Sequence, residues 1–168
     1  FNKLNGGNMM ELVKKLSNRQ YINGEWVESA NKNTRDIINP YNQEVIFTVT
    51  EGTKEDAEQA ILAARRSFEN GEWSQETSEV RGKKVREIAD KITENRDELA
   101  KLETLDTGKT LEESYADMDD IANVFNYFAG LADKDGGEII ESPIPNTESK
   151  IIKEPVGVVT QITPWNYP

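Results

Sequence analysis

The segment Thr163–Pro168, TPWNYP, holds the residue types of this sequence that are best suited to chemistry. Its prolines fix φ and stiffen the loop, and Asn166 between them carries an amide donor. A donor held in this way can stabilise charge that develops on an oxygen without reorganising, so Asn166 is a candidate oxyanion donor. Trp165 and Tyr167 offer flat faces to a cofactor or a cation. An aromatic turn in which Asn serves only the backbone is the alternative, and spacing alone does not decide between them.

The rest of the residue inventory restricts the chemistry further. The sequence contains no Cys and no His. The chain therefore supplies no thiol nucleophile, no disulfide, no imidazole base and no Cys/His metal site. Any chemistry falls to carboxylates, Lys, Tyr, hydroxyls and amides, or to residues on another piece of chain.

The tripeptide Gly108-Lys109-Thr110 resembles the end of a phosphate-binding P-loop. The full pattern needs a Gly five residues before Gly108, where Glu103 stands, and a preceding strand, where a helix is expected. We therefore favour a helix that ends at Gly108 and is followed directly by the next helix.

Three carboxylates, Glu113, Asp117 and Asp120, fall on one face of a predicted helix. Metal sites in helix bundles combine such carboxylates with His, which this chain lacks. The pattern therefore favours a solvated acidic face.

Turn and helix signals predict the elements that must position these residues. Asn23-Gly24 is typical of a type I′ hairpin, and Asn39-Pro40 opens a second turn. Four helices are expected after the hairpins: from Thr53 to Gly71, over 79–94, from Asn95 to Gly108, and over 111–134. The stripe of the first helix that is expected to be buried consists of Ala57, Ala60, Ile61, Ala64 and Phe68.

The C-terminal stretch changes character after the helices. ESPIPNTESK reads as a loop, Lys150–Glu154 alternates weakly as an exposed strand, and Val156–Ile162 is an apolar, β-branched run. Such a run is typical of a strand covered on both faces of a parallel sheet. In open α/β sheets ligands bind beyond the carboxyl ends of strands, which is where TPWNYP falls. We predict an α/β fold whose remaining sheet strands lie outside this chain.

Composition excludes several partners. The 168 residues carry a net charge of −11, which argues against binding to nucleic acid or to an anionic membrane surface. No apolar stretch is long enough to span a bilayer and no signal-like segment is visible, so the cytoplasm is the expected compartment. Residues 1–16, which begin FNKLNGGNMM, are set aside as an added or frayed tail.

The segment KEPVGVVTQITPWNYP resembles the signature stretch of the NAD(P)-dependent aldehyde dehydrogenase superfamily. Further blocks match in family order, from about Gln20 to the end: YINGEWV, INPYNQEVI, AILAARRSFENGEW, ADKITENRDELAKLETLDTGKTLEES and YFAGLADKDGGE. Within that family LETLDTGKTLEES, NVFNYFAGLADK and TPWNYP are most similar to betaine aldehyde dehydrogenases, including the staphylococcal type.

The resemblance implies roles for individual residues. Asn166 would donate to the oxyanion, and Tyr167 would form one wall of an aromatic box around a trimethylammonium group. Residues that would lie near NAD, with NADP left open, are Thr163, Pro164 and Trp165. Oxygens that would hold a monovalent cation such as K⁺ belong to Ile37, Ile38 and Asp106.

The resemblance also implies an organisation. Residues 17–140 would form the N-terminal part of an NAD-binding domain, 141–155 an oligomerisation arm, and 156–168 the first Rossmann-like strand with its active-site loop. The parent would be a cytoplasmic homotetramer, a dimer of dimers, that makes the osmoprotectant glycine betaine through a catalytic Cys. That Cys and the family's general-base Glu lie outside this sequence, so the chain alone is expected to be inactive.

Two alternatives stay open. One is another aldehyde dehydrogenase, in which Tyr167 merely packs, and the other is a non-catalytic assembly module.

Overall fold

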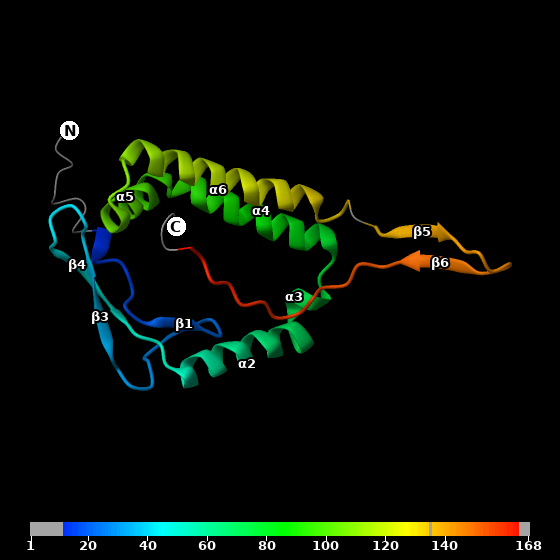
Figure 1. Ribbon diagram of the computed structural model, residues 1–168, viewed down its shortest axis with the longest axis horizontal. Helices are drawn as coiled ribbons and strands as arrows, with labels where there is room; N and C mark the ends of the chain where they lie inside the picture. Colours follow the sequence, from blue (N-terminus) through cyan, green and yellow to red (C-terminus); the bar gives the residue numbers. More distant parts are fainter. Residues whose placement is uncertain (1–11, 135, 165–168) are drawn as a thin grey trace.

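The computed structural model describes residues 12–134 and 136–164 (Figure 1). Two short hairpins come first: β1 Gln20–Ile22 with β2 Glu25–Val27, and β3 Thr34–Ile38 with β4 Val45–Thr50. The helices follow: α2 Lys54–Asn70, α3 Glu72–Gln75, α4 Ser78–Glu94, α5 Arg96–Thr107 and α6 Leu111–Leu131. A third hairpin, β5 Glu138–Glu141 with β6 Glu148–Ile151, extends away from the helices (Figure 1).

Both predicted turns of the first two hairpins are confirmed. Asn23 and Gly24 have φ of 54° and 84° between the paired residues Ile22 and Glu25, as a two-residue turn requires. The register of the β3–β4 ladder shifts between Ile37, which pairs with Phe47, and Ile38, which pairs with Val45. This β-bulge leaves Ile46 without an opposite residue and bends the hairpin at that point.

Local capping chemistry sets the helix ends. Thr53 and Thr110 form capping boxes with Asp56 and Glu113, which satisfy the free amides that begin α2 and α6. Gly108 ends α5 in the left-handed conformation, with φ of 76°, as predicted. The last helix stops at Leu131, three residues earlier than expected, and the short helix α3 was not predicted.

Small side chains dominate the buried seam between helices α4, α5 and α6. Its fully or nearly buried members are Ala89, Ala100, Ser114, Met118, Ala122 and Ala129. A Cβ built on Gly82 of α4 would stand only 2.9 Å from the Ala129 carbonyl oxygen of α6. The backbones of α4 and α6 therefore approach closely at Gly82.

The prediction of which side of α2 is buried is wrong. Ala57, Ala60, Ile61 and Ala64 are exposed and Phe68 is half-buried, whereas the buried residues of this helix are Asp56 and Ala63. The spacing identified an apolar face correctly, but periodicity does not show whether a second element of the same chain covers it.

The expected strand over 156–162 does not form within the described residues. This run is irregular and has no strand partner within residues 12–134 and 136–164, and Val156 and Ile162 are 91% and 93% exposed. A strand exists only where a neighbour takes its backbone hydrogen bonds, and the described residues include no such neighbour. Because the remaining sheet strands were expected outside this chain, the strand stays a prediction. The expected loop ESPIPNTESK instead forms the turn and flanks of the β5–β6 hairpin, and the weak strand predicted from Lys150 begins at Glu148.

Candidate functional site

The loop that follows residue 162 carries the predicted catalytic group. Thr163 and Pro164 are exposed and lie in irregular chain. Trp165, Asn166 and Tyr167 lie outside the described residues, so their roles stay predictions. Thr163 and Pro164 are open to a ligand, but without a phosphate-binding turn or a charged group they do not make a dinucleotide site by themselves.

The residues expected to hold a monovalent cation come from two separate elements that meet. Ile37 of β3 and Asp106 of α5 line the same cavity of about 610 Å³. A Cβ on Gly108 would stand 3.0 Å from Pro40 Cγ, so the β3–β4 turn lies against the loop after α5. Ile38 belongs to the adjoining bulge but does not line the cavity.

This cavity has walls that are mostly apolar. Its lining includes Trp26, Phe47, Leu102, Met118 and Ile121, with Glu103 and Asp106 as the carboxylates. Over the described ranges, no group of three His, Cys, Asp or Glu side chains is placed to hold a metal ion. A cation here would therefore depend on the Asp106 carboxylate and on backbone carbonyl oxygens of the β3 segment, which are suitable hard ligands.

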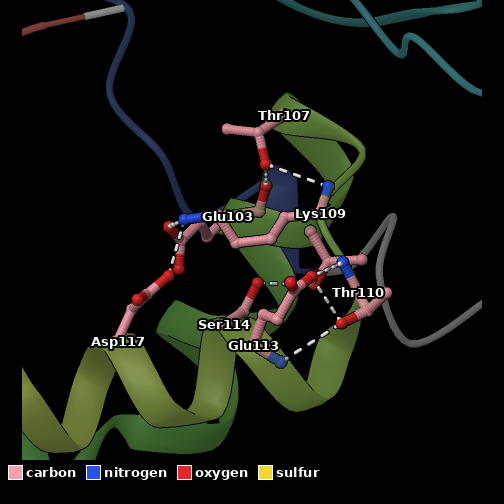
Figure 2. A network of polar contacts seen from close by, with 8 residues as sticks. Glu103, Thr107, Lys109, Thr110, Glu113, Ser114 and Asp117 are labelled. Atoms are coloured by element: carbon pink, nitrogen blue, oxygen red, sulfur yellow. Dashed lines mark hydrogen bonds and ion pairs between the residues drawn. The ribbon is translucent and has the colours of Figure 1, made fainter. Parts of the chain in front are cut away.

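Figure 2 shows the surroundings of the Gly108-Lys109-Thr110 loop. The Lys109 Nζ donates to Glu103 Oε1 at 2.7 Å and to Asp117 Oδ2 at 2.5 Å, which ties α5 to α6. The three side chains are only 8%, 11% and 19% exposed. The hydrogen bond to Asp117, followed by that to Glu103, raises the pKa of Lys109 well above its ordinary value. The tripeptide is thus a structural connection between two helices, as the favoured interpretation held.

The expected solvated acidic face is wrong for one of its three members. Glu113 caps α6 through Thr110 and Asp120 is exposed, but Asp117 is partly buried against Lys109. Helical spacing could not reveal this contact, because it relates only residues within one helix and Lys109 lies in the loop before α6.

A second polar cluster surrounds Asp56, the residue that completes the capping box of α2 with Thr53. Its carboxylate accepts from Ser29 Oγ at 2.6 Å, from the Ala30 amide at 3.2 Å and from Gln20 Nε2 at 3.1 Å. It also accepts from the Thr53 amide at 2.8 Å. These hydrogen bonds, that from Ser29 first, hold the pKa of Asp56 well below its usual range. Asp56 therefore fixes the β1–β2 hairpin to the start of α2.

Comparison with known proteins places this architecture in a family. The model of the aldehyde dehydrogenase family matches residues 26–168, so the chain belongs to that family. Betaine aldehyde dehydrogenase of Bacillus subtilis is 64% identical over 153 residues, which cover 91% of this chain and 31% of that protein. Aminoaldehyde dehydrogenase 1 of Pisum sativum is 45% identical, covering 91% of this chain and 32% of that protein.

A solved structure extends the match to three dimensions. Betaine aldehyde dehydrogenase of Staphylococcus aureus in complex with NAD⁺ is 85% identical, with a TM-score of 0.93, over 96% of this chain and 32% of that chain. The chain thus spans about a third of the length of these relatives and aligns with the N-terminal third of the family fold. The resemblance read from the sequence is confirmed. In the part of the chain that the structure describes, no helix is long and apolar enough to cross a membrane.

Proposed function

We propose that this chain is the N-terminal part of an enzyme that oxidises betaine aldehyde to glycine betaine with NAD⁺. The observation that carries the proposal is the 85% identity to the Staphylococcus aureus betaine aldehyde dehydrogenase whose structure contains NAD⁺. The Bacillus subtilis relative with the same name supports it at 64%. A cytoplasmic location of the parent is part of the proposal, supported by the bacterial source of this relative.

Within this proposal the chain orients substrate and stabilises charge but supplies no nucleophile, because it has no Cys. Bound NAD⁺ would serve as the hydride acceptor, next to Thr163, Pro164 and Trp165. The Asn166 amide would donate to the oxygen that becomes negative as the aldehyde carbon turns tetrahedral. Tyr167 would face the trimethylammonium group, a permanent cation that cannot donate a hydrogen bond and is suited to an aromatic face.

The proposed monovalent cation would lie between the β3 bulge and Asp106. Support comes from the shared cavity, from the bulge at Ile37 and Ile38, and from the approach of Pro40 to Gly108. In the parent enzyme, Asp106→Asn should abolish any difference in thermal midpoint between K⁺ and a bulky organic cation. A difference that survives the substitution would remove Asp106 from the site.

The β5–β6 hairpin is proposed to be an oligomerisation arm in a homotetrameric parent. Its strands pair only with each other in the described sheets, and Ile139 is 78% exposed. Apolar side chains on a two-stranded hairpin gain burial only against another surface.

The proposal is tested in two steps. The 168-residue chain alone, given betaine aldehyde and NAD⁺, should produce no NADH absorbance, and turnover by the chain would refute the division of roles. In the parent enzyme, Asn166→Ala should lower kcat about 10²–10³-fold, the effect of losing one oxyanion donor. An unchanged kcat would overturn the assignment of Asn166.

A second candidate substrate class is an aminoaldehyde, because the Pisum sativum aminoaldehyde dehydrogenase is 45% identical. Comparing kcat/KM of the parent for betaine aldehyde and for an aminoaldehyde separates the two, and a higher value for the aminoaldehyde would favour that class. Tyr167→Ala tests the cation box itself: it should raise KM for betaine aldehyde while leaving an uncharged aldehyde unaffected, and an unchanged KM for betaine aldehyde would mean that Tyr167 merely packs. A native polypeptide of 19.0 kDa, rather than a much larger parent, would favour the non-catalytic assembly module.

A further inference from the structure

The same tetrapeptide, Asn-Gly-Glu-Trp, occurs twice in this chain, at residues 23–26 and 70–73. The first copy forms the turn of the β1–β2 hairpin and the start of β2. The second spans the last residue of α2, its Gly71 cap and the start of α3. Two identical tetrapeptides are thus held in different backbone conformations.

An Asn followed by Gly can modify itself. The backbone nitrogen of the Gly attacks the side-chain amide carbon of the Asn, a C–N bond forms, the N–H proton passes to water, and ammonia leaves. Water then opens the resulting succinimide ring at either carbonyl, which leaves Asp or isoaspartate. Gly favours this step because it has no Cβ to obstruct the attacking nitrogen. Water is the only co-reactant.

The first copy presents few obstacles to this reaction. Asn23 and Gly24 are both exposed at the tip of the hairpin, and the ladder stops at the pair Ile22 and Glu25. Within residues 12–134 and 136–164, the Gly24 amide donates no hydrogen bond outside that ladder. The strands are three residues long, so opening them locally costs little.

The second copy is constrained. The Gly71 amide donates to the Ser67 carbonyl oxygen at 2.9 Å, and a Cβ at Gly71 would stand 2.3 Å from that oxygen. The Ser74 hydroxyl donates to the Gly71 carbonyl oxygen at 2.9 Å. Attack by the Gly71 nitrogen on Asn70 must break the bond to Ser67 and unwind the junction of two helices.

We propose that Asn23 is a self-modification site of this chain, converted through a succinimide to Asp and isoaspartate, and that the fold protects Asn70 from the same reaction. The products differ in consequence. Asp-Gly still forms a type I′ turn, but isoaspartate adds a methylene to the backbone of a two-residue loop. The pairing of Ile22 with Glu25 cannot then be kept, and the strain reaches α2 through the bond from Gln20 to Asp56.

The experiment follows both sites in one sample of the intact 168-residue chain, incubated at mildly alkaline pH. Trypsin releases residues 20–32 and 67–81 as separate peptides, and fragment-ion mass spectrometry assigns the modified Asn in each. We expect Asn23 to convert at least ~10-fold faster than Asn70, which corresponds to about 1.4 kcal/mol of additional opening free energy at Asn70. In concentrated urea the two rates should agree within about twofold, because the fold no longer distinguishes the copies.

Equal rates in the folded chain would overturn the proposal, and so would a tenfold gap that persists in urea, since it would then stem from sequence and not from structure. Asn23→Asp serves as the matched control: its far-ultraviolet spectrum should match that of the unmodified chain, so that spectral change in aged protein reports isoaspartate. A third pair, Asn5-Gly6, lies outside the described residues and is followed in its own peptide, 4–14.

Discussion

Replacing Lys109 with Met removes the cation shared by α5 and α6 while it keeps most of the aliphatic volume. In the native chain the Lys109 Nζ lies 2.7 Å from Glu103 Oε1 and 2.5 Å from Asp117 Oδ2. Glu103 Oε2 is already buried without a hydrogen-bond partner in the described part of the chain. In the variant both carboxylates would have to remain in a largely dry position without their shared donor.

The size of the effect follows from burial. Removing one partner of a buried ion pair costs about 3–5 kcal/mol, because the remaining charge stays desolvated. Asp117 is 19% exposed and can regain some water, which places the expected loss near the lower end, ~3 kcal/mol. With a urea dependence of about 2 kcal/mol per molar, the unfolding midpoint should fall by ~1.5 M.

The assay is urea unfolding followed by far-ultraviolet circular dichroism at neutral pH. Lys91→Met is the matched control, because Lys91 pairs with Glu94 at 2.6 Å on the exposed surface and should shift the midpoint by no more than about 0.2 M. Adding Glu103→Gln to Lys109→Met should restore part of the loss, since one uncompensated charge is removed. If Lys109→Met behaves like Lys91→Met, the cluster does not hold the two helices together.

Three further predictions concern other contacts. Gly108→Ala should destabilise the chain by about 1–2 kcal/mol, because an L side chain at φ 76° is strained and its Cβ would press on Pro40; an unchanged urea midpoint would contradict this. Asp56→Asn should lower the thermal midpoint at neutral pH. The pKa of Asp56 is depressed, so its contribution is present above the ordinary value of 3.8 and is lost as pH falls through the folded value. The gap between native chain and variant should therefore narrow in acid, and a constant gap would refute the role of the carboxylate. Replacing residues 138–151 with a short flexible linker should leave the urea midpoint of the helices unchanged, since among the described strands β5 and β6 pair only with each other. If light scattering of the parent enzyme gives the same oligomer size with and without the β5–β6 hairpin, the hairpin is not an assembly arm.

Turns and helix ends were predictable from sequence because they depend on neighbours in the chain. Asn23-Gly24, the Thr53 cap and Gly108 each act within a few residues, and the structure places all three as expected. The candidate cation residues Ile37 and Asp106 were proposed from the resemblance, and the structure brings both to one cavity.

What the sequence could not show are contacts and covers supplied from a distance. Lys109 reaches Asp117 from outside the helix, and Ser29 reaches Asp56 across 27 positions, so no periodicity reports either contact. The apolar face of α2 and the run 156–162 both favour burial, but burial needs a second surface that covers them. Residues 157–159 and Phe68 line one cavity, yet Ile61 and Val156 stay exposed, so the described chain covers these faces only in part.

Because α4 and α6 approach closely at Gly82, substitutions on the α6 side cannot make room for a larger residue at this position. A Cβ at Gly82 would meet both the Ala129 carbonyl oxygen and the Ala132 Cβ at 2.9 Å. Shrinking Ala132 to Gly could relieve the second contact, but the first is with main chain, which no substitution makes smaller. Sequence drift on the facing positions of α6 therefore cannot compensate for a larger residue at Gly82. The spacing of these two helices is set by backbone, and it should persist in relatives whose surrounding side chains have diverged.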